Sequence, residues 1–99
     1  FEFDKALVDI DKYLSLKPYN SGMWYEKCRM HNILRQHQQG VDACNRAISL
    51  NPKGLYHFER AKSHFGIQNN AAAKQDIQIA QSKGYQGSVS ITNQILNSQ

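Results

Sequence analysis

The sequence predicts an all-α fold in which similar pairs of helices follow one another along the chain. One pattern is written twice: WYEKCRMH at residues 24–31 and HFERAKSH at residues 57–64 lie 33 positions apart. Apolar side chains also recur at spacings of three and four, as they do on one face of a helix. No segment alternates polar and apolar residues for long enough to predict a strand.

Length and composition limit the classes of protein to consider. The 99 residues correspond to one small domain, near the lower limit for an independent core. The formal net charge is +4, but the twelve Lys and Arg residues are scattered singly. Because a nucleic-acid binder gathers its cations into a stripe, this distribution argues against a nucleic-acid surface. No apolar run approaches the roughly 18 residues of a membrane span, and two cysteines are too few for a disulfide framework.

The repetition extends beyond the two octapeptides. A shift of 33 aligns the first halves of the units, and a shift of 34 places residues 4–18 over residues 38–52. A one-residue deletion after Pro52 explains the difference. Periodicity of this length is typical of stacked supersecondary units. The coincident pairs include Tyr25 with Phe58, Glu26 with Glu59, Lys27 with Arg60, Arg29 with Lys62, His31 with His64, Leu16 with Leu50, and Pro18 with Pro52.

Each unit divides into two helical segments. Residues 21–34 place four side chains in one stripe, and residues 4–18 and 38–52 contain similar stripes. The stripes are Trp24, Cys28, His31 and Leu34; Ala6, Ile10, Tyr13 and Leu14; and Val41, Cys44, Ala47 and Ile48. Capping and turn residues flank these segments. They are Asn20-Ser21, Lys17-Pro18, Asn51-Pro52, Asn69-Asn70 and Lys83-Gly84.

The pattern resembles the tetratricopeptide repeat, a helix-turn-helix unit with the signature W-x2-L-G-x2-Y…A-x3-F…P. The tryptophan and the spacing are kept, while Lys27, Cys28 and His31 replace Leu, Gly and Tyr, and Gly84 replaces the terminal proline region. Other matching positions are Ala6-x3-Ile10 with Pro18, Gly40-x3-Cys44 with Ala47 and Pro52, and Ala61, His64 and Ala73-x3-Ile77 with Ala80.

The resemblance implies a tetratricopeptide-type α-solenoid of antiparallel helix hairpins, with about two and a half repeats and a C-terminal capping helix. Residues 1–99 would form a single domain. Residues 1–18 would supply the second helix of a partial repeat, residues 20–52 and 53–84 two repeats, and residues 85–99 the capping helix.

The first helix would lack the partner that the family places before it. Because stacked repeats need about three units for stability, we expect upstream sequence or a second copy of the chain to cover Phe1, Phe3, Ile10 and Tyr13. Homo-oligomerisation through this helix is therefore one predicted interaction.

In this family the first helix of each repeat lines a concave groove. Each such helix here offers an aromatic residue and, one turn later, a cation. The predicted peptide-binding residues are Tyr25, Arg29, Asn32, Phe58, Lys62 and Phe65. Glu26 and Glu59 would lie at the groove edge and repel the acidic terminus of a chaperone tail.

These residues predict a non-enzymatic protein-protein interaction module, part of a larger protein. It would bind a peptide or partner segment that carries apolar and acidic groups. One alternative is that Tyr25 and Phe58 only pack between repeats, in a structural or self-association segment without a groove. Another is a basic α-solenoid that contacts nucleic acid.

The remaining polar residues predict no catalytic or metal site. Cys28, His31 and Cys44 face one seam and could converge on a metal, but the repeat gives each a packing position. No cofactor is therefore expected. The chain lacks a nucleophile elbow, a glycine-rich phosphate loop and a metalloprotease helix, so no enzyme is predicted. The compartment stays unknown, with the cytoplasm as default, because no signal or transmembrane segment is present.

Two cations and two histidines occupy inward positions of the repeats. Lys27 and Arg60 stand where the family has leucine. They either reach a carboxylate such as Asp9 or Asp76, or extend into solvent. His31 and His64 are predicted to be core histidines with one satisfied ring nitrogen.

Overall fold

The computed structural model describes residues 2–99, and these residues form six α-helices and no strand. The all-α prediction is therefore confirmed. The helices are α1 (Glu2–Leu16), α2 (Ser21–Ile33), α3 (His37–Leu50), α4 (Gly54–Gly66), α5 (Asn70–Ser82) and α6 (Val89–Leu96).

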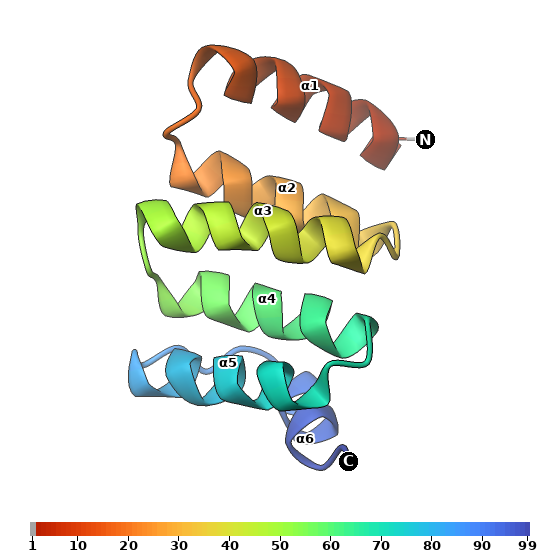
Figure 1. Cartoon of the computed structure of the whole chain (residues 1–99), viewed down its shortest axis with the longest axis vertical. Coiled ribbons are helices and arrows are strands. Elements are labelled where there is room, and N and C mark those ends of the chain that lie inside the picture. Colours follow the sequence, from red (N-terminus) through yellow and green to blue (C-terminus); the bar gives the residue numbers. More distant parts are fainter. Residues whose placement is uncertain (1) are drawn as a thin grey trace.

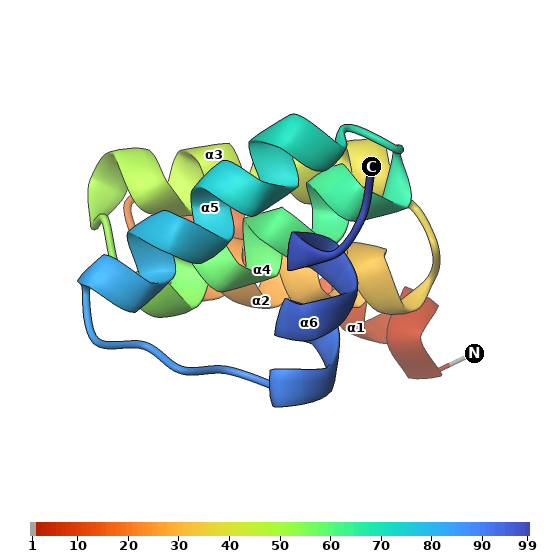
Figure 2. The same ribbon diagram turned by 90° about the horizontal axis from the view of Figure 1, so that it is seen from below.

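The helices follow one another along the longest axis of a body of 39 × 27 × 19 Å (Figure 1). Short turns join α2 to α3 and α4 to α5, so each pair runs antiparallel and packs closely. Helix α4 also packs against α3 and α2, while α1 contacts α2. Seen along the long axis, α6 and the segment before it lie on the side of α4 away from α3 (Figure 2).

Helix starts and stops lie where the sequence predicts them. The side chain of Asn20 accepts a hydrogen bond from the backbone N–H of Met23 at 3.0 Å, and Asn69 caps α5 in the same way. These bonds satisfy N–H groups that a helix start leaves unpaired. Helices α1 and α3 end two residues before Pro18 and Pro52, and Gly84 follows α5 with a φ of 82°.

The two turns inside the helix pairs share one backbone geometry. Arg35 and Gln68, 33 residues apart, both adopt the left-handed conformation, with φ values of 61° and 63°. The next N–H in each turn donates to a histidine carbonyl, from Gln36 to His31 and from Asn69 to His64, at 2.8 Å in both. The 33-residue period of the sequence is thus also a period of the backbone.

Buried apolar residues gather where the helices meet. Ala61 and Ala73 are fully buried between α4 and α5, where small side chains allow close approach. Ile95 of α6 joins the same cluster and is also fully buried. A separate cluster joins α1 to α2 through Ile10, Leu14 and Met30.

One expectation for α1 is wrong in part. Ile10 is buried and Tyr13 is half-buried, because both pack toward α2 rather than away from it. Asn20 also donates to the Tyr13 hydroxyl at 2.9 Å. Phe3 is 41% exposed, as expected for an uncovered face, and Phe1 lies outside the described residues.

A glutamine in the left-handed conformation predicts a stabilising substitution. Gln68→Gly should raise the free energy of unfolding by about 0.5–1 kcal/mol, since glycine adopts positive φ without a Cβ clash. Thermal unfolding should show a midpoint several degrees higher, at about 4–8 °C per kcal/mol.

Gln78→Gly is the matched control, because Gln78 is an exposed residue inside α5. It should lower stability by about 1 kcal/mol through the poor helix propensity of glycine. Destabilisation by both substitutions would mean that the turn at Gln68 does not have this backbone.

Candidate functional site

Helices α2 and α4 meet through a pair of stacked tyrosines. The rings of Tyr25 and Tyr56 lie 5.2 Å apart at 28°, and Arg29 lies over Tyr25 with its guanidinium carbon 6.0 Å from the ring centre. Arg29 also forms an ion pair with Glu26 at 2.9 Å. Burial, with a smaller effect from the nearby Glu59 carboxylate, raises the pKa of Tyr25 to about 12. Tyr25 therefore stays a neutral packing group at the helix junction.

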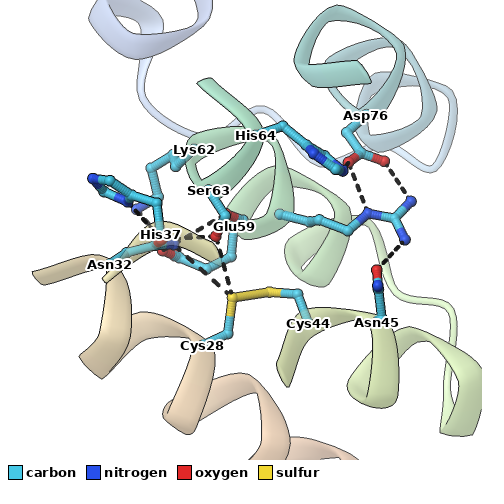
Figure 3. Close-up of a disulfide and its surroundings, with 11 residues drawn as sticks. Cys28, Asn32, His37, Cys44, Asn45, Glu59, Lys62, Ser63, His64 and Asp76 are labelled. Atoms are coloured by element: carbon cyan, nitrogen blue, oxygen red, sulfur yellow. Dashed lines mark hydrogen bonds and ion pairs between the residues drawn. A yellow bond between two sulfur atoms is a disulfide. The ribbon is translucent and has the colours of Figure 1, made fainter. Parts of the chain in front are cut away.

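A buried carboxylate lies beside this stack. Glu59 is only 4% exposed, yet its oxygens have two partners: Asn32 Nδ2 donates at 2.8 Å and Lys62 Nζ lies at 3.0 Å (Figure 3). Ser63 in turn donates to Asn32 Oδ1 at 2.7 Å. A buried charge requires such partners. The Glu59 charge is compensated inside the protein, so it is not the repulsive group that the sequence suggested.

The C-terminal segment covers Phe58. This side chain is 6% exposed and packs against Tyr85, with ring centres 5.5 Å apart. A Cβ at Gly87 would stand 2.5 Å from the Phe58 ring, so only glycine lets the backbone pass this close. Phe58 thus belongs to the core, which agrees with the packing alternative for this residue.

Two adjoining pockets form a groove on this side of the molecule. Their volumes are about 260 and 270 Å³, and both are lined by His37 and Lys62. Burial, together with the charge of Arg35, lowers the pKa of His37. The first pocket adds Arg29, Asn32, Ile33 and Glu59. The second adds Arg35, Phe65, Gly66, Ile91, Gln94 and Ile95.

The structure thus brings four of the six predicted residues to one groove: Arg29, Asn32, Lys62 and Phe65. Tyr25 and Phe58 do not line it. The α6 residues Ile91, Gln94 and Ile95 do line it, and the sequence analysis missed them. Their loose apolar spacing predicts a helix but does not indicate which surface that helix covers.

A disulfide joins α2 to α3, which the sequence analysis did not predict. Cys28 and Cys44 are bonded to each other, with their Cα atoms 5.3 Å apart, and both are fully buried. The sequence predicts them only as separate packing residues at the seam. The Cys28 sulfur also contacts the Ser63 hydroxyl at 3.7 Å and the Asn32 amide at 3.9 Å. The disulfide therefore adjoins the side chains that hold Glu59 (Figure 3).

A second buried carboxylate lies between α4 and α5. Asp76, 2% exposed, accepts two hydrogen bonds from the Arg60 guanidinium at 2.8 Å, and His57 Nδ1 lies 3.0 Å away. Arg60 also donates to Asn45 at 2.9 Å. The predicted pairing of Arg60 with Asp76 is confirmed.

The other predicted polar contacts are partly wrong. Lys27 pairs with Asp11 at 2.7 Å rather than with Asp9. His31 Nδ1 lies 2.9 Å from the Gln36 amide oxygen, as expected of a satisfied histidine. In contrast, His64 Nδ1 is buried with no hydrogen-bond partner among residues 2–99, and its Nε2 lies 3.8 Å from Asp76 Oδ2. Burial and the charge of Arg60 lower the pKa of His64, although Asp76 acts in the opposite direction.

Among residues 2–99, no helix combines the length and the apolar character needed to cross a membrane. In the same part of the chain, no three His, Cys, Asp or Glu side chains are grouped as metal ligands.

Comparison of the chain with protein-family models, curated proteins and solved structures found no match.

The disulfide should be a major source of stability. Replacing both Cys28 and Cys44 by alanine should lower the free energy of unfolding by about 3 kcal/mol, as expected when a loop of this length is no longer closed. Thermal unfolding with and without dithiothreitol measures this. Reductant should destabilise the natural chain and leave the double variant unchanged, whereas free thiols in the purified natural chain would contradict the bond.

The lowered pKa of His64 predicts how stability depends on pH. Because the folded-state pKa lies below the ordinary value of 6.5, the unfolded chain binds the proton first as pH falls. The contribution of His64 to the free energy of unfolding is therefore fully present above about pH 6.5 and decreases as the pH falls below that value. Urea unfolding between pH 5 and pH 8 should show this decline, and His64→Gln should make it shallower. An equally steep decline in the variant would refute the assignment.

Proposed function

We propose that the chain is a tetratricopeptide-type α-solenoid and acts as a non-enzymatic protein-interaction module. The 33-residue recurrence of sequence, helix pairs and turn geometry supports this proposal. Its ligand is a peptide or partner segment that lies in the groove between α2, α4 and α6. Such helix-lined surfaces bind extended partners in repeat proteins.

The charge of the groove is the observation that carries the proposal. Arg29, Arg35 and Lys62 line it against one carboxylate, Glu59, which is buried and already bonded to Asn32 and Lys62. Arg29 is also paired with Glu26, at 2.9 Å, so three cations stand against two carboxylates and the lining keeps one net positive charge. Electrostatic complementarity therefore favours a ligand with acidic groups.

Apolar side chains give the groove its second property. Phe65 and Ile91 line the pocket next to Arg35, over the fully buried Ile95. The ligand would pack an apolar side chain in this pocket and pair a carboxylate with the cations of the groove. In this proposal Phe65 contacts the ligand, while Tyr25 and Phe58 hold the groove walls in place.

The disulfide indicates the redox state of the compartment in which the protein functions. Disulfides persist in oxidising surroundings and are rare in reducing ones. We therefore favour an oxidising compartment over the cytoplasmic default.

Self-association is the second candidate, favoured by exposed apolar residues on α1. Phe3 is 41% and Val8 53% exposed. Light scattering over a range of concentrations tests it. A monomer at all concentrations would remove this candidate, and Phe3→Ser with Val8→Ser should reduce any dimer.

Peptide selection tests the proposed groove. Peptides selected from a random display library on the immobilised protein should combine acidic and apolar residues. Replacing Arg29 and Arg35 together by glutamine should weaken the best of them by about tenfold, a loss of about 1.4 kcal/mol. Isothermal titration at two salt concentrations measures this affinity.

Arg46→Gln is the matched control, because Arg46 is an exposed cation of α3 that does not line the groove. It should leave the affinity unchanged. Equal weakening by both changes, or selected peptides without acidic residues, would contradict the proposal. Displacement of the peptide by nucleic acid with a steep salt dependence would instead favour the nucleic-acid alternative.

A further inference from the structure

A larger cavity lies away from the groove, where α1, α2 and α3 meet. Its volume is about 340 Å³, within the range of small-ligand sites. Asp11 of α1, Trp24, Lys27 and His31 of α2, and Asp42 and Ala43 of α3 line it. The proposed peptide-binding function does not use these residues.

Five lining residues of this cavity have counterparts in the Asp76 cluster of the following repeat. A shift of 33 carries Trp24 to His57, Lys27 to Arg60, His31 to His64 and Ala43 to Asp76, and a shift of 34 carries Asp11 to Asn45. In the cluster, the Arg60 guanidinium fills the space and bridges the two flanking helices, from Asp76 of α5 to Asn45 of α3. The second repeat therefore shows which group occupies this position when it is filled.

The corresponding position in the first repeat is open for two reasons. Ala43 has no polar group to match the Asp76 carboxylate. The ammonium group of Lys27 pairs with Asp11 at 2.7 Å and lies 5.4 Å from the centre of the Trp24 ring, but forms no ion pair with Asp42 within residues 2–99. Across the cavity, Asp42 is exposed and accepts a hydrogen bond from the Gln38 amide at 3.3 Å. Within residues 2–99, no Lys or Arg forms an ion pair with Asp42. In the described part of the chain, no cation bridges α1 to α3 as Arg60 bridges α3 to α5.

The charges around the cavity favour a cation. Asp11 and Asp42 contribute two negative charges and Lys27 one positive charge, so the carboxylates of the lining outnumber its cation by one. In the filled cluster, Asp76 and Arg60 balance each other. One further positive charge would give the first repeat the same balance.

We propose that this cavity binds a guanidinium group, which bridges Asp11 and Asp42 beside the Trp24 indole. A planar guanidinium donates to two carboxylates at once and stacks on aromatic rings, whereas an ammonium does neither as well. The group comes from an arginine side chain of a partner or from a small guanidinium compound.

Trp24 reports on the cavity directly, because it is the single tryptophan of the chain. Its fluorescence should change saturably on titration with acetyl-Gly-Arg-Gly-amide at low salt. The peptide with citrulline, the neutral isostere of arginine, should cause no saturable change. Agmatine serves as the small-molecule probe, and its affinity relative to the arginine peptide distinguishes the two sources.

Two variants test the geometry. Asp42→Asn removes an exposed charge without disturbing the core, and should weaken the arginine peptide by about tenfold. Lys27→Arg should place the chain's own guanidinium across the cavity, abolish binding of the peptide and raise the unfolding temperature.

Three results would overturn the proposal. They are equal responses to the arginine and citrulline peptides, unchanged affinity in Asp42→Asn, or undiminished binding in Lys27→Arg.

Discussion

The structure depends on how α2 is held between its neighbours. Cys28 bonds to α3 through a fully buried disulfide, and the same turn of α2 presents Asn32 to the buried Glu59 of α4. Burying the Glu59 carboxylate without partners would cost free energy. The position of α4 is therefore fixed where Asn32, Lys62 and Ser63 complete the hydrogen-bond network around it. Because α2 lines both the groove and the cavity, the geometry of both sites depends on this seam.

The two helix pairs have the same turn geometry but differ in the side chains at their inward positions. In the second pair, a carboxylate, a guanidinium and two histidines fill the inward position, whereas the first pair has alanine and lysine there and, together with α1, borders an open cavity. The chain thereby presents two surfaces of different character: a basic, partly apolar groove on one side and an acidic, aromatic cavity elsewhere.

Much of the fold could be predicted because its determinants are local. The caps at Asn20 and Asn69, the small residues Ala61 and Ala73, and the apolar stripes act within a few residues of sequence. The site was predicted less completely, since burial of Phe58 depends on a segment nearly thirty residues away. The disulfide was missed because two buried cysteines give the same sequence signal whether they are bonded or only packed.

Contacts between successive helix pairs place α2 directly against α4. Nuclear Overhauser effects in uniformly labelled protein report on this contact. Cross-peaks are expected between the rings of Tyr25 and Tyr56, 5.2 Å apart, and between the Asn32 side-chain amide and the Glu59 side chain. Absence of these cross-peaks, with α2 and α3 still in contact, would show that the pairs do not stack in this way.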